Sequence, residues 1–126
     1  MNIKKGIIFA AIFVSAGSLF AQTGNIRKAQ TSFQKYYEFK QAGNAKLGES
    51  FIAEAKTAID AAVVHEKTKE SAEAWTLYSM VYSNIGADNN NEEELIKAKE
   101  AIKTARSLDK DKKNEEKKQI EEFKRR

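Results

Sequence analysis

Cysteine and proline are both absent from this chain of 126 residues, and glycine occurs only six times. Without cysteine the protein can form neither a disulfide nor a thiolate metal site. It also lacks the residue that carries the lipid of a bacterial lipoprotein. Without proline, and with little glycine, few residues are present that break helices. The first expectation is therefore an all-α protein.

Histidine is scarce as well, and motifs typical of catalytic or metal sites are absent. His65 is the one histidine, and the segment HEKTK lacks the second histidine of an HExxH zinc site. The segment from Asp88 alternates as a calcium loop does, but Glu93 and Lys99 occupy the places that require glycine and glutamate. No GxSxG elbow or glycine-rich phosphate loop is present. We expect no enzymatic activity, no metal and no cofactor.

The chain begins with two lysines followed by an uncharged, largely apolar stretch. Lys4 and Lys5 precede sixteen residues without a charge, which is the form of a secretory signal peptide. The stretch is short for a membrane span, which needs about 20 predominantly apolar residues. We expect a signal peptide over residues 1–21, cut after Ala21 or alternatively after Ser18, and no stable membrane span afterwards. This predicts a periplasmic or secreted protein.

The charge balance argues against nucleic acid as a partner. The net charge of +4 falls to +2 when Lys4 and Lys5 leave with the signal peptide, and nucleic-acid binding needs a denser basic patch. In residues 111–126, lysines alternate with acidic pairs as on a solvated helix face, and only Ile120 and Phe123 are available to bury. This stretch is predicted to be a terminal cap, a solvated tail, or the first turns of another repeat.

Apolar residues at spacings of three and four predict two helices in the first half of the chain after the signal peptide. One is expected over about 25–42, with Gly43 in the left-handed conformation that ends a helix. The other is expected over about 50–66, where the apolar positions form a single stripe. Residues 44–49 would then be a loop.

Two more helices are predicted in the second half. Ser71 can cap the start of a third helix, which would end at Ile85 with Gly86 as its left-handed stop. Asn91, followed three residues later by a glutamate, can cap a fourth helix over about 92–108. The polar residues between the two helices are expected to form a loop.

The second and fourth predicted helices share a pattern. Each carries Ala, then Ile four residues later, then Ala three residues later, and the two copies lie 43 positions apart: Ala55, Ile59 and Ala62, then Ala98, Ile102 and Ala105. Solenoid proteins repeat every 20 to 50 residues or so. Alanine at fixed helix positions lets a neighbouring helix approach closely. The chain is therefore expected to consist of helix-turn-helix repeats.

The third and fourth helices together resemble a tetratricopeptide repeat. The first helix of that family carries a large aromatic residue, a large apolar residue, a small residue and a tyrosine, which here are Trp75, Tyr78, Ser79 and Tyr82. The second helix carries Ala, a large residue, Ala and a terminal Leu-Asp, which here are Ala98, Ile102, Ala105, Leu108 and Asp109.

The chain departs from the family in several ways. Lys110 stands where the family has proline, the connection Gly86–Asn91 is longer than the family's tight turn, and the 43-residue offset exceeds a period of about 34. The first unit keeps only part of the pattern, in Phe33, Tyr36 and Tyr37. An unrelated helical bundle is the alternative fold.

The resemblance implies an α-solenoid of about two tetratricopeptide-like units over residues 22–110, with residues 111–126 as a capping or solvated helix. Such units form a concave face, lined by the first helix of each, on which a peptide or protein can lie. The resemblance places on that face the side chains of Thr76, Met80, Ser83 and Asn84.

The expected function is that of an exported protein–protein interaction module. The alternative is a periplasmic chaperone or envelope-structural factor that uses an apolar patch and the basic tail. Two units are fewer than the three or so that a stable stack needs. The C-terminal stretch, a homo-oligomer or further chain is therefore expected to complete the stack.

Overall fold

The structure, a computed structural model, describes residues 20–125, and their side chains from residue 24 onward. The predicted signal peptide, residues 1–21, thus lies almost wholly outside the described residues. The described chain contains four helices and no strand, so the all-α prediction is confirmed: α2 (Phe20–Gln41), α3 (Ala45–Ala62), α4 (Ala72–Asn89) and α5 (Glu92–Arg125).

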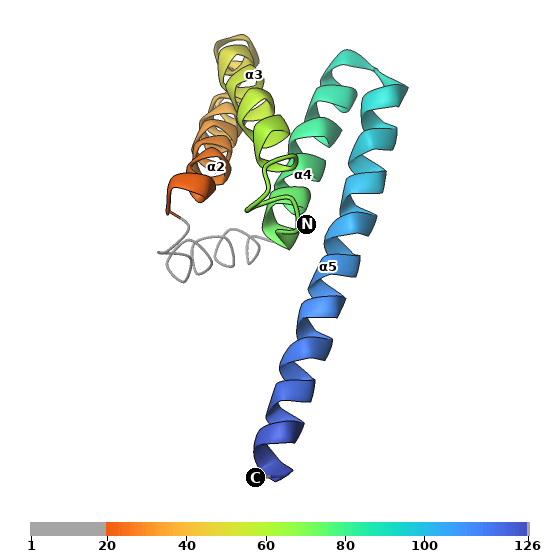
Figure 1. Cartoon of the computed structure of the whole chain (residues 1–126). Helices are drawn as coiled ribbons and strands as arrows, with labels where there is room; N and C mark the ends of the chain where they lie inside the picture. Colours follow the sequence, from red (N-terminus) through yellow and green to blue (C-terminus); the bar gives the residue numbers. More distant parts are fainter. Residues whose placement is uncertain (1–19, 126) are drawn as a thin grey trace.

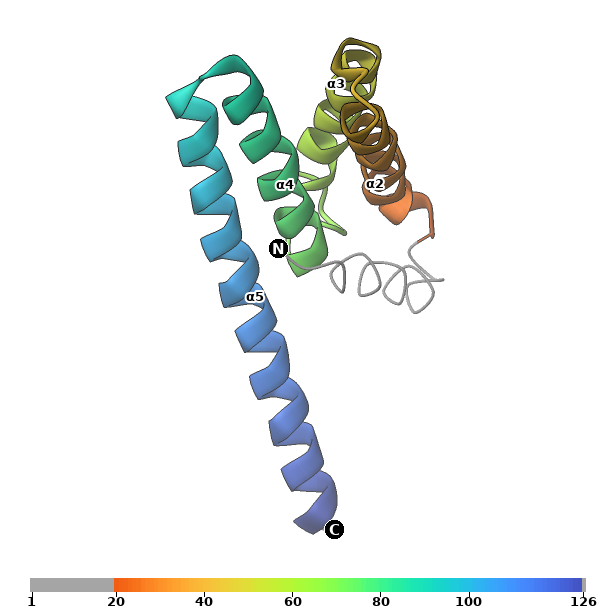
Figure 2. The ribbon, with the colours of Figure 1, turned by 180° about the vertical axis from the view of Figure 1, so that it is seen from behind.

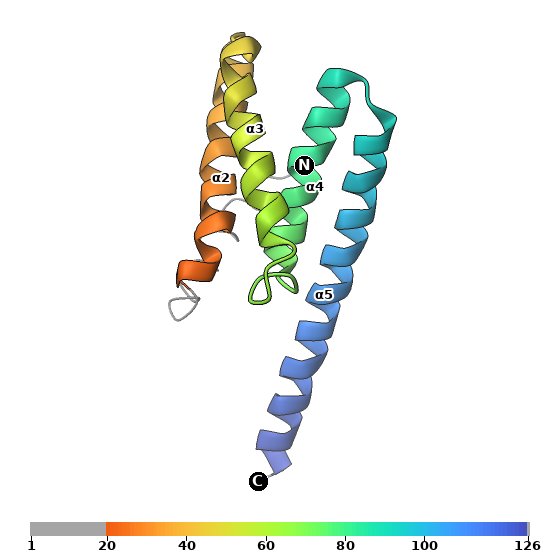
Figure 3. The same cartoon turned by 45° about the horizontal axis from the view of Figure 1, so that its top comes forward.

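The helices run alternately in opposite directions and form two hairpins (Figures 1 and 2). α2 packs along α3, and α4 packs along α5. The hairpins meet mainly where α3 packs on α4, with a smaller contact between α2 and α4 (Figure 3). The C-terminal half of α5 extends well beyond the other three helices (Figure 1). This is the helical-hairpin arrangement that the sequence predicts.

The first connection is shorter than predicted. Gly43 has a φ of 81° and ends the first hairpin arm as expected, but α3 begins at Ala45, so the prediction of a loop over 44–49 is wrong. A Cβ on Gly48 would lie 3.1 Å from the carbonyl oxygen of Tyr36. Gly48 is therefore a helical residue that lets α3 approach α2 closely, rather than a loop residue.

The prediction that Gly86 ends α4 is also wrong. α4 continues to Asn89, and Asn90, with a φ of 51°, provides the left-handed cap. A Cβ on Gly86 would lie 2.7 Å from Leu95 Cγ and 3.1 Å from the carbonyl oxygen of Asn91. Glycine is needed here because α5 returns against this point of α4, so the requirement is steric rather than conformational.

Both predicted N-caps are present. Ser71 Oγ accepts a hydrogen bond from the backbone N–H of Ala74 at 3.2 Å. Asn91 Oδ1 accepts from the N–H groups of Glu93 and Glu94 at 3.1 and 3.4 Å. Each cap satisfies N–H groups that the first turn of a helix leaves without a partner.

The prediction that the fourth helix ends near residue 108 is wrong, because α5 continues to Arg125. Its second half consists of good helix formers without a glycine or proline. A pair of charged residues four apart, Asp109 and Lys113, is joined at 3.1 Å. Every side chain from Asp109 to Arg125 is exposed. Residues 109–125 thus form an exposed extension of α5.

The core is thin and rich in alanine. Ile59 and Val81 are fully buried, and Leu77 is 1% exposed. The alanines of the repeated pattern surround them, including Ala55 and Ala62, which are also fully buried. Small residues let the helix axes come close, so a few large side chains are enough to fill the space between them. No helix among the described residues is both long and apolar enough to cross a membrane.

Candidate functional site

One side of α4 carries a ladder of aromatic rings. The ring centres of Trp75 and Tyr78 lie 5.5 Å apart, and those of Tyr78 and Tyr82 lie 4.1 Å apart and nearly parallel. Trp75 Nε1 donates a hydrogen bond of 2.7 Å to the carbonyl oxygen of Lys69. Tyr82 is buried, and the other two rings are partly buried against the core. These rings pack helices together and leave little aromatic surface for a ligand.

Tyr82 joins three helices. Its hydroxyl donates to Asp60 Oδ1 of α3 at 2.6 Å. The ammonium groups of Lys56 from α3 and Lys97 from α5 lie 5.5 and 5.7 Å from its ring centre. Burial, followed by the hydrogen bond to Asp60, raises the pKa of the Tyr82 hydroxyl well above its usual value. The phenol is therefore a neutral structural donor.

The small residue of the repeat pattern, Ser79, lies where α4 meets α5. Its hydroxyl donates a hydrogen bond of 2.8 Å to the carbonyl oxygen of Ala98. Ala98 is itself 5% exposed. A larger residue at either position would push the two helices apart.

The other side of α4 carries the residues predicted to bind a partner. Met80 is two positions from both Tyr78 and Tyr82, which is roughly 200° round a helix, so it lies opposite the aromatic ladder. Thr76 and Ser83 share its side and, like it, are half-buried. Their hydroxyls donate to carbonyl oxygens of α4 itself, at 2.8 and 3.1 Å.

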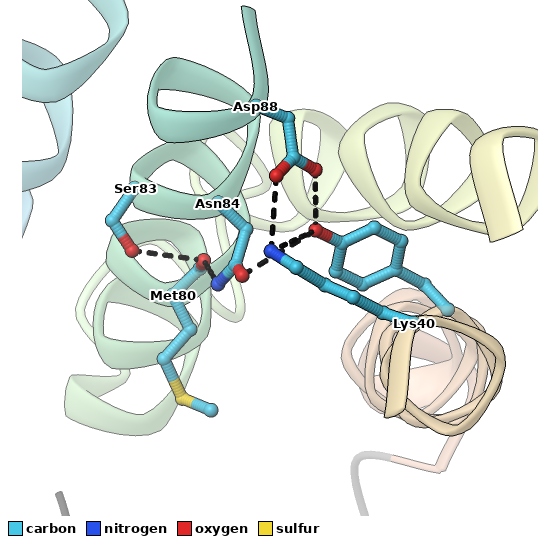
Figure 4. A network of polar contacts seen from close by, with 6 residues as sticks. Lys40, Met80, Ser83, Asn84 and Asp88 are labelled. Atoms are coloured by element: carbon cyan, nitrogen blue, oxygen red, sulfur yellow. Dashed lines mark hydrogen bonds and ion pairs between the residues drawn. The ribbon is translucent and has the colours of Figure 1, made fainter. Parts of the chain in front are cut away.

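Asn84, the fourth predicted residue, is already engaged within the protein. Its Nδ2 donates to the carbonyl oxygen of Met80 at 2.8 Å, and its Oδ1 accepts from the hydroxyl of Tyr36 at 3.4 Å. Figure 4 shows Asn84 directed toward Lys40 and Asp88, whereas the thioether of Met80 is directed away from them. The structure thus separates Asn84, at the contact between α2 and α4, from the other three residues.

One side of α2 corresponds to the side of α4 that carries Met80. Lys35 lies over the ring of Phe51 of α3, with its Nζ 5.4 Å from the ring centre. Tyr37 is two positions on, roughly 200° round the helix, so it faces away from α3, as Met80 does. Tyr37 is 48% exposed, and its ring lies 6.4 Å from that of Phe33. The side of α2 that carries it also carries Gln30, Gln34 and Gln41.

By their helical positions these residues lie on one side of α2 and one side of α4, and we call the two sides together the α2–α4 face. It consists of Gln30, Gln34, Tyr37, Gln41, Thr76, Met80, Ser83 and Ala87. Not one of the eight is charged, in a chain of which 32% is charged. The four residues of α2 were not predicted from the sequence as part of a binding face, although their spacing of four, three and four marks one side of a helix.

A polar network holds α2 against α4 beside this face (Figure 4). The Tyr36 hydroxyl donates to Asp88 Oδ2 at 2.5 Å, and Lys40 Nζ donates to Asp88 Oδ1 at 2.9 Å and to the Tyr36 oxygen at 3.2 Å. Tyr36 is 2% exposed. The sequence analysis missed Lys40 and Asp88, because nothing in the sequence pairs residues 48 positions apart.

The network shifts the titration of its members. Burial acts to raise the pKa of Asp88, but the hydrogen bonds from Tyr36 and Lys40 outweigh it and hold the pKa below its usual value. The hydrogen bond to Asp88 is the main cause of a raised pKa for Lys40. Burial, and then the bond to Asp88, raises the pKa of Tyr36. An ionised carboxylate with a neutral phenol and an ammonium group is the favoured state.

The free energy of unfolding is expected to depend on pH through this network. Because the pKa of Asp88 is lower in the folded state, its contribution is present above the usual value of 3.8 and is lost as the pH falls below it. Because the pKa values of Tyr36 and Lys40 are raised, their contributions are present below 10.0 and 10.5 and are lost as the pH rises through the folded values.

Asp88→Asn tests the contribution of the Asp88 carboxylate to this pH dependence. Solvent screens a pair that is more than one third exposed, so we expect a loss of about 0.5 to 1 kcal/mol at pH 7 that is smaller at pH 3, where Asp88 is mostly protonated in the unfolded state. Urea denaturation at both pH values measures it, with Asp109→Asn, which removes an exposed pair of α5, as the control. Equal losses at pH 7 and pH 3 would contradict a contribution from the ionised Asp88.

Among the described residues, no group of three or more His, Cys, Asp or Glu side chains is placed to hold a metal ion. Comparison of the chain with protein-family models, with curated proteins and with solved structures found no match.

Proposed function

We propose that the protein is an exported, tetratricopeptide-like interaction module that binds a peptide or an extended protein segment on the α2–α4 face. The observation that carries this proposal is the composition of the face. Two neighbouring helices of the same direction present amide, hydroxyl, thioether and phenol groups there without a charge. A surface of this kind suits a ligand recognised through its backbone.

The chemistry of the face matches an extended peptide. The amides of Gln30, Gln34 and Gln41 each offer a donor and an acceptor, which are the two groups that a peptide backbone presents. Tyr37 and Met80 add apolar surface that adapts to side chains of different shape. Because the face carries no charge, binding there is expected to change little with salt.

The packing of the second helices supports the repeat interpretation. Ala55, Ile59 and Ala62 of α3 are fully buried. Their counterparts in α5, Ala98 and Ala105, are 5% and 3% exposed. The same residues thus pack the second helix of each hairpin, and α2 and α4 are the first helices, which line the ligand face in such repeats.

A second candidate is a chaperone-like or envelope-structural role through an apolar patch and the basic tail. It is favoured by the exposure of Ile120 and Phe123, at 55% and 79%, on the solvated half of α5. Binding through this half would weaken steeply with salt, because it depends on exposed charges. Salt dependence therefore separates the two candidates.

Met80→Glu is the first test. The full chain, expressed with its N-terminal segment, is crosslinked in an envelope extract at low and high salt. We expect Met80→Glu to reduce capture of a discrete partner at least about tenfold, since a carboxylate desolvated without a partner opposes binding by several kcal/mol. The helical circular dichroism should not change, because Met80 is only half-buried and lies outside the core cluster.

Two variants control this experiment. Tyr37→Glu places the same charge on the α2 part of the α2–α4 face and should abolish the same capture. Val64→Glu places it on an exposed apolar residue in the turn after α3, 76% exposed, and should leave capture unchanged. Capture that survives both face variants and disappears at high salt would overturn the proposal in favour of the second candidate.

A further inference from the structure

α5 has two chemically different sides. One line of residues, at spacings of three and four that average the 3.6 of a helical turn, carries three apolar residues, Leu95, Ile102 and Ile120. All other positions on it are basic: Lys99, Arg106, Lys110, Lys113, Lys117 and Lys124. We call this line the basic stripe. Ile102 is half-buried, and the rest of the stripe is exposed.

Half of the acidic residues of α5 lie on the opposite side. The line on that side carries Glu93, Glu100, Asp111, Glu115 and Glu122, together with Lys97 and Lys118. Within the described part of the chain, Lys113 is the one basic residue of the stripe with an ion pair, to Asp109 at 3.1 Å. A solvated helix whose charges only aid solubility would mix both signs round its axis. On α5 the opposite side does mix the two signs, but the basic stripe itself contains no acidic residue.

The internal repeat indicates what the first half of the stripe does. Forty-three positions earlier, Leu95, Ile102 and Arg106 correspond to Ile52 and Ile59 of α3 and to Val63, its C-cap. α3 packs on both α2 and α4, and there Ile59 is fully buried, Val63 is 8% exposed and Ile52 is half-buried. Beyond Leu95, which packs on Gly86 of α4, the same side of α5 therefore has the form of a surface on which a helix packs, and no helix among the described residues covers it.

The charges show which kind of helix fits. At the contact between α3 and α4, Asp60 accepts the hydrogen bond of Tyr82 at 2.6 Å. The corresponding position in α5 is Lys103, and Val63 is replaced by Arg106. In a helix that packs on α5, these two cations favour a carboxylate at the position where α4 has the hydroxyl of Tyr82. A helix that packs here needs an apolar line for Leu95 and Ile102 and acidic residues beside it.

We propose that the basic stripe of α5 binds an acidic amphipathic helix of a partner protein. The site is separate from the α2–α4 face, and it does not depend on the function proposed there. A membrane fits less well, because Leu95, Ile102 and Ile120 are about 10 and 27 Å apart along the helix. Three separated side chains do not make the continuous apolar face that an interfacial helix inserts into lipid.

The test uses the full chain and a synthetic 18-residue peptide with leucines on one helical face and glutamates beside them. Fluorescence anisotropy at physiological salt measures the Kd. We expect the triple variant Arg106→Glu, Lys110→Glu, Lys117→Glu to weaken binding at least about tenfold, since three opposite-charge contacts become repulsive. The matched variant Lys112→Glu, Lys118→Glu, Arg125→Glu makes the same charge change off the stripe, and we expect less than about a twofold effect.

Four outcomes would overturn the proposal. Equal weakening by the two triple variants would mean non-specific attraction. Equal binding of a scrambled peptide of the same composition would mean that an amphipathic helix is not required. Binding to phosphatidylglycerol vesicles but not to the peptide would assign the stripe to lipid. Self-association of the chain, removed by the stripe variant alone in sedimentation, would make a second copy the occupant.

Discussion

Ile59→Ala is expected to lower the free energy of unfolding by about 2 to 5 kcal/mol, the usual range for truncating a fully buried isoleucine. Ile59 has no exposed surface and lies in α3, which packs on both α2 and α4. The alanines around it cannot move in to fill the space, because helix backbones hold them. A domain of this size is stable by only about 5 to 15 kcal/mol, so the loss is a large fraction of the total.

The repeat supplies a matched control for this variant. Ile102 occupies the same place in the pattern, 43 positions later, but α5 has no further hairpin against it and the residue is half-buried. We expect Ile102→Ala to cost about 1 to 2 kcal/mol, because less apolar surface is lost from the interior. Urea denaturation followed by circular dichroism measures both. Equal costs would contradict the difference in packing between the two hairpins.

Trp75→Ala is expected to cost about 2 to 4 kcal/mol, toward the lower part of the range for large aromatic residues because the ring is only partly buried. The variant removes the first ring of the ladder, 5.5 Å from Tyr78. It also removes the N–H that donates to the carbonyl oxygen of Lys69 at 2.7 Å. That bond ties the turn between α3 and α4 to the start of α4.

Two comparisons separate these contributions. Trp75→Phe keeps an aromatic ring and loses the N–H, so we expect a cost of about 1 kcal/mol. Tyr37→Ala removes a ring that is 48% exposed and, as a surface change, should cost about 0.5 kcal/mol or less. A cost for Trp75→Ala no larger than that for Tyr37→Ala would show that the ladder is a surface feature rather than part of the core.

Local signals in the sequence predicted the starts of α4 and α5 well. Ser71 and Asn91 cap the helices that follow them, because a side-chain oxygen two or three residues before an unpartnered N–H can reach it in any fold. Gly43 ends a helix because only the left-handed conformation closes that turn. In each case the interacting groups are a few residues apart, so the sequence contains both partners side by side.

Glycine was predicted less well where its role is steric. Gly86 was expected to end a helix and Gly48 to lie in a loop, yet both lie inside helices at close approaches to another helix. A left-handed glycine and a glycine at a helix contact look alike in sequence. Only the position of Leu95 against Gly86, or of Tyr36 against Gly48, distinguishes them.

The candidate site was likewise predicted only in part. Thr76, Met80 and Ser83 were predicted from the spacing of a single helix, and they do share one uncovered side of α4. Their binding role stays a prediction. The α2 residues of the α2–α4 face, around Tyr37, could have been found from their spacing. They were not, because no motif points to them. Asn84 was placed with the ligand face, whereas its amide is bonded to Met80 and Tyr36.

By itself, then, the sequence determined the helical class, the capped helix starts and the repeated Ala–Ile–Ala pattern, because each follows from backbone geometry and contacts within a few turns. Only the tertiary structure decided that Tyr36, Lys40 and Asp88 meet, that Gly86 lies beneath Leu95 and that, beyond Leu95, one side of α5 has no helix of the described residues against it. These features join residues from different helices. Their geometry depends on how closely the helices pack, which side-chain volume across the whole core decides.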